Sequence, residues 1–347
     1  MKANNYKLSI VVAIYNLDSY LNKCLDSLVN QTLKEIEILC VDDGSTDKSG
    51  KIIDEYEKMY PNKIKAFHKE NGGEFTTRSY GLSKASGEYV AFVDCDDYVR
   101  KEWAEKLYNA AKENDADLAV CAYDRINIDN GKLVSRDMAG FGNCQKKILP
   151  NDDFIAYINT ALWNKVFKLE KVKDLQFFHI KGYNDAMFCM MAYTKLEKVV
   201  FITDSLYCYN LRVDSQINNI NLQDLEKLKK YLLEVKKIYK INNKYDEMKE
   251  LLDLMAFLHL GVAAIYRASY DKNVNIKKEL KEIKNYLDNN FRSWRNNPFL
   301  KLSNCYNKGI RHIALWGVAI LYKLNLGIIY IKSYRFLVDK LKIDIKF

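Results

Sequence analysis

Short apolar runs that alternate with segments of helical period constrain this fold more than any other feature of the chain. The runs are rich in β-branched residues and almost continuous in apolar character. They cover residues 8–15, 36–41, 64–68, 88–94 and 117–123. Strands that are covered on both faces have this pattern, and the segments between them have the spacing of amphipathic helices. The series predicts an α/β fold with a mainly parallel, Rossmann-like sheet flanked by helices, and it places ligands at the carboxyl ends of the strands.

After about residue 125 the pattern becomes mixed and then helical. Apolar residues recur at helical spacing over 222–238, and two more helical segments follow near 246–268 and 275–289. Sustained helical spacing of this kind predicts a helical C-terminal region. We therefore expect an α/β domain, a helical appendage and a basic tail, at residues 1–217, 218–290 and 291–347.

The net charge of +9 lies entirely in the tail. Residues 291–347 hold eleven Lys or Arg and two acidic residues, so the rest of the chain is balanced. Near the end of the tail, apolar side chains fall on one helical face and mostly basic ones on the other. The apolar face has Tyr334, Leu337, Val338, Leu341 and Ile345, and the polar face has Lys332, Arg335, Asp339, Lys342 and Lys346. Such a helix fits an anionic membrane surface, and the alternative is packing on the chain's own domain or on a partner.

Two other roles for the tail are disfavoured. Nucleic acid is not an expected partner, because the basic residues alternate with many apolar ones instead of lining a polar groove. The apolar run over 313–331 is long enough to span a bilayer, but Lys323 and Asn325 interrupt it, and central charge is costly in lipid. We therefore expect peripheral association with a membrane.

The cysteines and the N-terminal segment indicate a reducing compartment. None of the eight cysteines falls at CxxC spacing, and three lie in apolar, strand-like runs, where cysteine acts as a small buried hydrophobe. The opening segment MKANNYKLSIVV has too short an apolar run for a secretory signal. We expect the chain to work on the cytoplasmic side of the membrane.

Acidic side chains gather where two of the predicted strands end. Asp42 and Asp43 follow the second strand, and Asp94, Asp96 and Asp97 follow the fourth. Carboxylates this close repel one another unless a cation or hydrogen-bond donors compensate. Either acidic segment alone is typical of an ordinary turn, but the two segments together at one sheet edge indicate a binding site. Hard oxygen ligands there suit Mg²⁺ or Mn²⁺ that also binds substrate phosphates.

A series of short motifs runs in order through residues 7–217. They are SIVVAIYN, SLVNQT, IEILCVDDGSTDKS, HKENGG, TTRSYG and SGEYVAFVDCDDYV, and then LWNKVFK, GYNDAMF and LYCYN. In this order and spacing the chain resembles the bacterial family 2 glycosyltransferases, which have the GT-A fold. The resemblance implies that residues 1–217 bind a UDP-sugar with Mn²⁺ or Mg²⁺ and transfer the sugar, a hexose, with inversion to a hydroxyl of a saccharide acceptor.

The same resemblance assigns five residues to the donor. Tyr15 and Asp43 correspond to the pair that stacks on uracil and hydrogen-bonds to it. Arg78 corresponds to an arginine that contacts the nucleotide, a role that suits its planar set of donors. Asp94 and Asp96 match the DxD motif, with Asp94 toward the ribose and Asp96 on the metal. The alternatives are ordinary burial for Tyr15 and a surface ion pair for Arg78.

On the acceptor side, the resemblance makes Asp185 the general base, with a helix N-cap as its alternative. Asn184 stands where the family commonly has Glu, Ser79 where it has Asn, and Asn210 where many members have Arg. Trp163 is either an apolar platform for the acceptor or a packed core side chain. These departures from the family pattern bear on the choice of donor or acceptor.

We therefore expect a metal-dependent glycosyltransferase in the synthesis of a cell-surface polysaccharide such as a capsule or an exopolysaccharide. The tail indicates an acceptor that is carried on a lipid at the cytoplasmic face of the cell membrane. One alternative is a sugar-phosphate nucleotidyltransferase, although the basic, glycine-rich phosphate loop expected of that class is missing from SIVVAIYN. The other is a non-catalytic, membrane-associated protein that binds a sugar nucleotide or a glycan and needs no base.

Overall fold

The computed structural model describes residues 6–138, 142–180, 182–211 and 220–341 of the 347-residue chain. The chain divides into two compact units. Unit 1 comprises Met1–Ile148, Asn159–His179 and Asn184–Ser215, and unit 2 comprises Leu149–Ile158, Ile180–Tyr183 and Gln216–Phe347.

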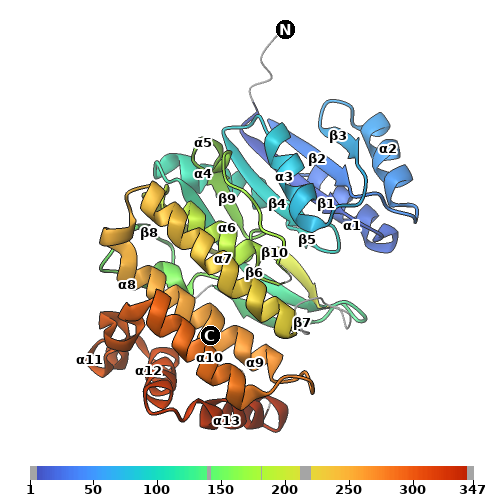
Figure 1. The fold of residues 1–347 in the computed structure, drawn as a ribbon. Helices are drawn as coiled ribbons and strands as arrows, with labels where there is room; N and C mark the ends of the chain where they lie inside the picture. Colours follow the sequence, from blue (N-terminus) through green and yellow to red (C-terminus); the bar gives the residue numbers. More distant parts are fainter. Residues whose placement is uncertain (1–5, 139–141, 181, 212–219, 342–347) are drawn as a thin grey trace. The chain divides into compact units, whose positions relative to one another are not determined.

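Unit 1 contains a ten-stranded mixed sheet with helices against it (Figure 1). The strands are β1 (Leu8–Ile14), β2 (Ile36–Asp42), β3 (Ile64–His68), β4 (Tyr89–Asp94), β5 (Tyr98–Val99), β6 (Leu118–Asn127), β7 (Leu133–Asp137), β8 (Cys144–Lys147), β9 (Lys165–Lys168) and β10 (Lys198–Leu211). Their order is β3-β2-β1-β4-β9-β6-β10-β5, with β7 beside β6 and β8 beside β10. The predicted fold class is confirmed.

The parallel part of this sheet is the part that the apolar runs predict. β1 to β4 are parallel neighbours, and β6 is parallel to β10. The short strands β5, β7, β8 and β9 are antiparallel additions, which the sequence analysis did not predict. Within the register of β1, Ile14 lies opposite Asp42 and Ala13 lies opposite Asp94. The two acidic segments therefore meet at the carboxyl edge of β1, as expected.

The helices of unit 1 are α1 (Asp18–Val29), α2 (Ser49–Met59), α3 (Glu74–Lys84), α4 (Trp103–Glu113), α5 (Leu169–Val172) and α6 (Asn184–Ala192). One close approach fixes where α3 lies. A Cβ atom on Gly81 would be 2.3 Å from a methyl carbon of Val11 in β1, so only glycine allows this contact. Because Arg78 lies one turn before Gly81, the same contact sets Arg78 near the sheet edge.

Unit 2 is helical, as predicted. Its main helices are α7 (Leu222–Ile241), α8 (Tyr245–Ala256), the π-helical η4 (Phe257–Ala264), α9 (Ile265–Ala268), α10 (Ile276–Asn290), α11 (Leu302–Cys305), α12 (Ile310–Lys323) and α13 (Gly327–Asp339). Short 3-10 turns occur at η2 (Phe154–Tyr157), η5 (Arg292–Asn296), η6 (Pro298–Leu300) and η7 (Tyr306–Lys308). The helical segments expected near 222–238, 246–268 and 275–289 are all present. In the described part of the chain, one helix, Tyr245–Ala268, is long and apolar enough to cross a membrane, and 78% of its most apolar window is buried.

Much of the tail takes part in the core of unit 2. The ring of Trp294 stacks on Phe257 at 5.3 Å, and the ring of Tyr322 lies edge-on to Phe257 at 5.5 Å. Tyr330 donates a hydrogen bond to the carbonyl of Val262 at 3.1 Å. These aromatic side chains of the tail therefore pack on the chain's own domain, which was the alternative to contact with a membrane.

The apolar run over 313–331 is not one continuous helix. It is divided between α12 and α13 by residues 324–326, and Asn325 has a φ of 62°, a left-handed conformation that Asn tolerates better than most residues. The amphipathic helix expected near the end is present in part: α13 ends at Asp339, before Leu341, and Tyr334 of the expected apolar face is buried against Tyr266. Three residues of its predicted faces, Lys342, Ile345 and Lys346, lie outside the described residues.

Candidate functional site

Asp43 is held by the loop that follows β3. Its Oδ1 accepts a hydrogen bond from Gly72 N–H at 3.0 Å and its Oδ2 accepts one from Gly73 N–H at 2.8 Å, and Lys69 forms an ion pair with Oδ1. Burial alone would raise the pKa of Asp43, but Lys69 and the two amides bring it below its ordinary value. A buried, ionised carboxylate therefore ties the ENGG loop to the end of β2.

Tyr15 lies just after β1 and is 48% exposed, so ordinary burial, the alternative considered for it, is wrong. The next residue, Asn16, has a φ of 49° and accepts a hydrogen bond from Thr46 N–H at 2.8 Å. Its own N–H donates to Ser45 Oγ at 3.0 Å. The loops after β1 and β2 are thus joined, and they present the Tyr15 side chain at the same sheet edge as Asp43.

Arg78 links the donor and acceptor candidates. Its Nη2 lies 2.7 Å from Asp94 Oδ1 and 2.7 Å from Glu74 Oε1, and its Nη1 pairs with Asp185 Oδ1. The residue is 3% exposed, so the surface ion pair considered for it is wrong. Burial opposes the charge of Arg78, but the three carboxylates hold its pKa well above the ordinary value. One guanidinium group thus joins three carboxyl groups.

Asp185 lies in the first turn of α6, and its side chain is 22% exposed. One oxygen pairs with Arg78, and the other accepts a hydrogen bond from Leu162 N–H at 3.3 Å. Burial raises the pKa of Asp185, and Arg78 opposes this shift. These partners are not the amides of α6, so the contacts of Asp185 differ from those of an N-cap.

A buried lysine fixes the segment that reaches Asp185. Lys165 donates to the carbonyl of Ala161 at 2.6 Å and to Asn164 Oδ1 at 2.7 Å, and it also bonds the carbonyl of Asn159. Burial lowers the pKa of Lys165 to about 8. All three N–H groups of the Lys165 ammonium therefore bond the turn that carries the Leu162 amide.

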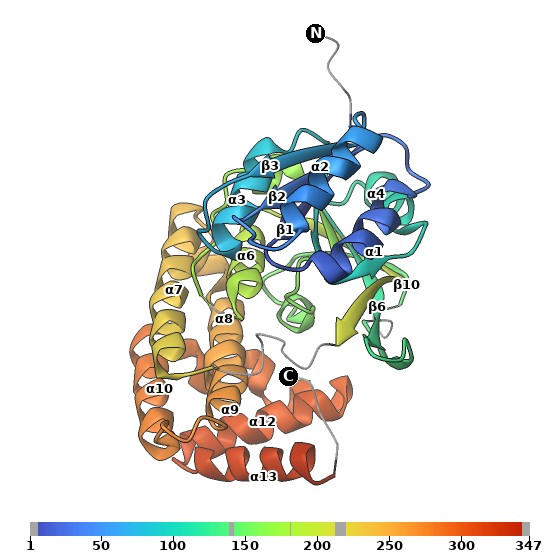
Figure 2. The same ribbon diagram turned by 90° about the vertical axis from the view of Figure 1, so that its right-hand side faces the viewer.

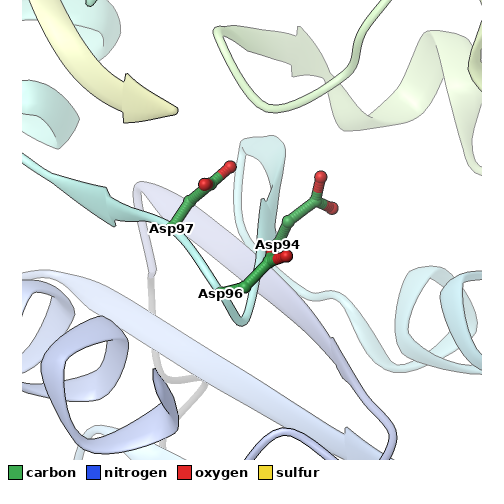
Figure 3. A group of neighbouring side chains, drawn as sticks. All are labelled: Asp94, Asp96 and Asp97. Atoms are coloured by element: carbon green, nitrogen blue, oxygen red, sulfur yellow. The ribbon is translucent and has the colours of Figure 1, made fainter. Parts of the chain in front are cut away.

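The acidic turn after β4 brings three carboxylates together, as Figure 3 shows. One oxygen from each of Asp94, Asp96 and Asp97 lies within 4.8 Å of the other two. Asp97 is buried and accepts from Tyr207 OH at 2.8 Å and from Asn210 N–H at 2.7 Å. Burial, with the charges of Asp96 and Asp94 adding to it, raises the pKa of Asp97.

Asp97 therefore serves to hold the turn, whereas Asp94 and Asp96 are partly exposed. Asn210 adds a second tie, because its Nδ2 donates to the carbonyl of Asp96 at 2.6 Å. Carboxylate oxygens held at this spacing fit Mg²⁺ or Mn²⁺, which prefer hard oxygen ligands. The donor chemistry of the turn thus suits the expected cation.

The two other acceptor-side residues are buried. Trp163 is 6% exposed, and its ring stacks on Tyr207 at 4.5 Å and on Tyr209 at 5.3 Å. Packing thus accounts for its position. Asn184 is also buried, and its Oδ1 accepts no hydrogen bond from the described residues.

Sequence reasoning missed several residues that complete the site. Glu74 precedes Arg78 by four residues, so predicting the helix over 74–84 would have predicted this pair. Tyr207 and Lys165 lie within the quoted motifs LYCYN and LWNKVFK, but nothing local to those motifs indicates their partners. Their roles arise from contacts between segments far apart in the sequence.

Comparisons with known proteins identify the family and the fold. The family model described as glycosyl transferase family 2 matches residues 9–176. Glycosyltransferase GlyG of Streptococcus pneumoniae serotype 4 is 33% identical over 218 residues, which cover 60% of this chain and 72% of GlyG. Poly(ribitol-phosphate) beta-glucosyltransferase of Bacillus spizizenii is 36% identical over 218 residues, 60% of this chain, but the match spans only 33% of that protein.

The fold has a solved counterpart. The crystal structure of S. aureus TarS 1–349 superposes with a TM-score of 0.70 at 21% identity, and the match covers 95% of this chain and 91% of that TarS fragment. This likeness, together with the sheet of unit 1, shows the GT-A fold. The chain belongs to glycosyl transferase family 2.

Proposed function

We propose that this chain transfers a sugar from a UDP-sugar to a hydroxyl of a saccharide acceptor, with Mn²⁺ or Mg²⁺, in the synthesis of a bacterial surface polysaccharide. One observation carries the proposal: Arg78 joins Asp94 of the DxD turn to Asp185 at a single sheet edge. Donor binding and proton removal need such neighbouring carboxylates. S. aureus TarS has been crystallised with UDP-GlcNAc, and the Bacillus spizizenii relative is named for a poly(ribitol-phosphate) polymer.

The donor would lie across the ends of β1, β2 and β4. The exposed ring of Tyr15 offers a stacking face for uracil. Asp43, held by the ENGG loop beside this ring, would accept a hydrogen bond from a base N–H. Asp94, held by Arg78, would face the ribose.

Asp96, with Asp94 beside it, would hold the divalent cation. When bound there, the cation stabilises the charge that develops on the departing diphosphate. The chain's own contribution is to fix the turn, because Asp97, Tyr207 and Asn210 anchor it to β10. An anchored turn keeps its oxygens in place without reorganisation during the reaction.

Asp185 would take the proton from the acceptor hydroxyl as the hydroxyl oxygen attacks the anomeric carbon. The bond between that carbon and the diphosphate oxygen breaks in the same step, so the configuration inverts. Burial raises the pKa of Asp185, which makes it a better proton acceptor than an exposed carboxylate. Buried Asn184, which precedes Asp185, and buried Trp163 would support the acceptor side by packing.

In this proposal residues 1–217 carry out the chemistry, residues 218–290 form a helical appendage, and residues 291–347 bring the enzyme to the cytoplasmic face of the cell membrane. The support is the charge of +9 within residues 291–347 and the exposed apolar side chains of that segment, among them Phe336 and Leu324. An acceptor carried on a lipid would then lie in the membrane that the enzyme binds.

The test is to incubate the purified chain with UDP-GlcNAc, UDP-glucose or UDP-galactose and Mn²⁺ and to measure UDP release. Slow release that EDTA abolishes is expected. Tight UDP binding without any release, even with added acceptor glycans, would instead indicate a sugar-nucleotide-binding protein. Release of pyrophosphate from UTP and a sugar phosphate would indicate a nucleotidyltransferase.

A further inference from the structure

An apolar groove lies between α12 and α13 of unit 2, two helices that are next to each other in Figures 1 and 2. Its volume is about 400 Å³, which is within the range of about 300–1,000 Å³ that holds small ligands. Trp316 and Leu321 line it from α12, and Tyr330 and Leu337 line it from α13. The hydroxyl of Tyr330 is already bonded to the carbonyl of Val262. Such a lining has little with which to bind a polar ligand, and it suits a hydrocarbon chain.

The floor of the groove includes a glycine in the middle of α12. A Cβ atom added to Gly317 would meet no other heavy atom within 4 Å. Glycine is unfavourable within a helix, so its position here, facing open space, fits a groove that is kept clear. It also provides a place where a larger side chain can fill the groove without disturbing its neighbours.

The surface beside the groove combines apolar and basic side chains. Ile329 is 45% exposed and Phe336 is 57% exposed, and a spacing of seven residues places them on one face of α13. Lys332 and Lys340 are exposed on the same helix or just after it. A surface with apolar side chains and neighbouring cations is typical of a protein that lies at the boundary between lipid headgroups and acyl chains.

Charge decides between a lipid and a second copy of the chain. Lys332 and Lys340 are exposed beside the groove, so two copies that met through this surface would bring these like charges together. An anionic lipid is attracted instead. We propose that the groove between α12 and α13 binds one hydrocarbon chain of an anionic membrane lipid. This proposal rests on the membrane association within the proposed function and is independent of the sugar transfer.

The test compares two substitutions at one position of the full chain. Gly317→Phe fills the groove, whereas Gly317→Ala adds only one methyl group and leaves it open. The probe is phosphatidylglycerol with a photoreactive diazirine on one acyl chain, at a low fraction in phosphatidylcholine vesicles. After irradiation, mass spectrometry measures the labelling of the peptides that contain residues 314–337. Ser333→Phe, which fills the groove from an exposed position on α13, replaces Gly317→Phe if that variant does not fold.

We expect labelling of wild type and of Gly317→Ala, and labelling reduced at least about fivefold in Gly317→Phe. Simple adsorption to the membrane surface predicts the opposite order, because an added Phe makes the surface more apolar. Equal or stronger labelling of Gly317→Phe, no labelling of wild type, or a dimer in solution that Gly317→Phe dissociates would each overturn the proposal.

UDP release, measured without vesicles, separates this proposal from the proposed function. The Gly317 substitutions lie outside unit 1, and we expect them to leave UDP release unchanged. Wild type that is labelled but never releases UDP would contradict the glycosyltransferase proposal and support the lipid site. Wild type that releases UDP but is not labelled would contradict the lipid site alone.

Discussion

The two segments that build the site, residues 8–99 and residues 159–210, hold their functional side chains in different ways. In the first, contacts join adjoining βα loops, as when Gly72 and Gly73 bond Asp43, 29 and 30 residues away in sequence. In the second, they join residues far apart in sequence, since Asp185 pairs with Arg78 over 107 residues and Tyr207 bonds Asp97 over 110. In the proposed function, the first segment therefore binds the donor, and the second supplies the base and steadies the acidic turn after β4.

The first prediction tests the donor side and has the largest expected effect. Asp96→Ala removes one of the carboxylates proposed to hold the cation and leaves the departing diphosphate with less charge compensation, so metal-supported UDP release should fall below detection. The measurement is UDP release at saturating Mn²⁺ with a UDP-sugar donor. Asp129→Ala, at an exposed carboxylate in the turn between β6 and β7, is the control and should behave as wild type. Undiminished release by Asp96→Ala would remove the metal assignment.

The second prediction separates chemistry from binding. Asp185→Asn keeps the shape of the side chain and an oxygen that accepts from Leu162 N–H, but it cannot take a proton. Transfer should slow by about 10²-fold or more, while the Kd for UDP with Mn²⁺ stays within about threefold of wild type. Turnover and calorimetric titration measure the two quantities. If UDP affinity fell instead, Asp185 would belong to the donor side, and the contrast between the two segments would fail.

The third prediction concerns the link between the segments. Tyr207→Phe keeps the ring that stacks on Trp163 but removes the hydroxyl that bonds Asp97. The same hydroxyl also accepts a hydrogen bond from Asp94 N–H at 3.3 Å, so the substitution removes two bonds to the acidic turn after β4. Losing the bond to the Asp97 carboxylate alone costs about 1–3 kcal/mol of free energy, and the turn should loosen. We expect UDP affinity in Mn²⁺ to fall by about tenfold, and UDP affinity in EDTA to be unaffected. Tyr306→Phe, at a ring that is 71% exposed, is the control.

The same difference between the two segments explains how much of the fold and of the site the sequence predicts. The βα loops follow strands whose apolar runs are unmistakable, so the placement of Asp43, Asp94 and Asp96 at one edge was predictable. The short antiparallel strand β9 and the pairing of Arg78 with Asp185 were not, because no local pattern encodes a contact across 107 residues. Trp163 shows the limit clearly: the sequence allowed a platform or a core side chain, and only the stacking of Tyr207 and Tyr209 on it decides.

The smallest expected effect lies within the first segment, away from the chemistry. His68 bonds Asp54 at 2.9 Å and Asp42 at 3.2 Å, and these carboxylates raise its pKa above the ordinary 6.5. Because the folded-state pKa is the higher one, the imidazolium stabilises the fold fully below about pH 6.5. This contribution is lost as the pH rises through the raised value. Exposed ion pairs contribute at most about 1 kcal/mol to the free energy of unfolding. Because the His68 side chain is half exposed, we expect a contribution no larger than this.

The measurement is the free energy of unfolding of wild type and His68→Gln between pH 5 and pH 9. The difference between the two should be greatest at low pH and shrink as the pH rises, with UDP affinity unchanged throughout. A difference that grows with pH would contradict the ion pairs that we assign to His68.

The central claim is that one sheet edge holds a metal-bound UDP-sugar between the DxD turn and Asp185. A crystal structure of the chain with UDP and Mn²⁺, with the metal located by anomalous scattering, tests it most directly. We expect a Mn²⁺ peak about 2.0–2.6 Å from a carboxylate oxygen of Asp96, with the diphosphate on the metal and the uracil against Tyr15. A Mn²⁺ peak away from Asp96, or a nucleotide bound elsewhere on the chain, would contradict it.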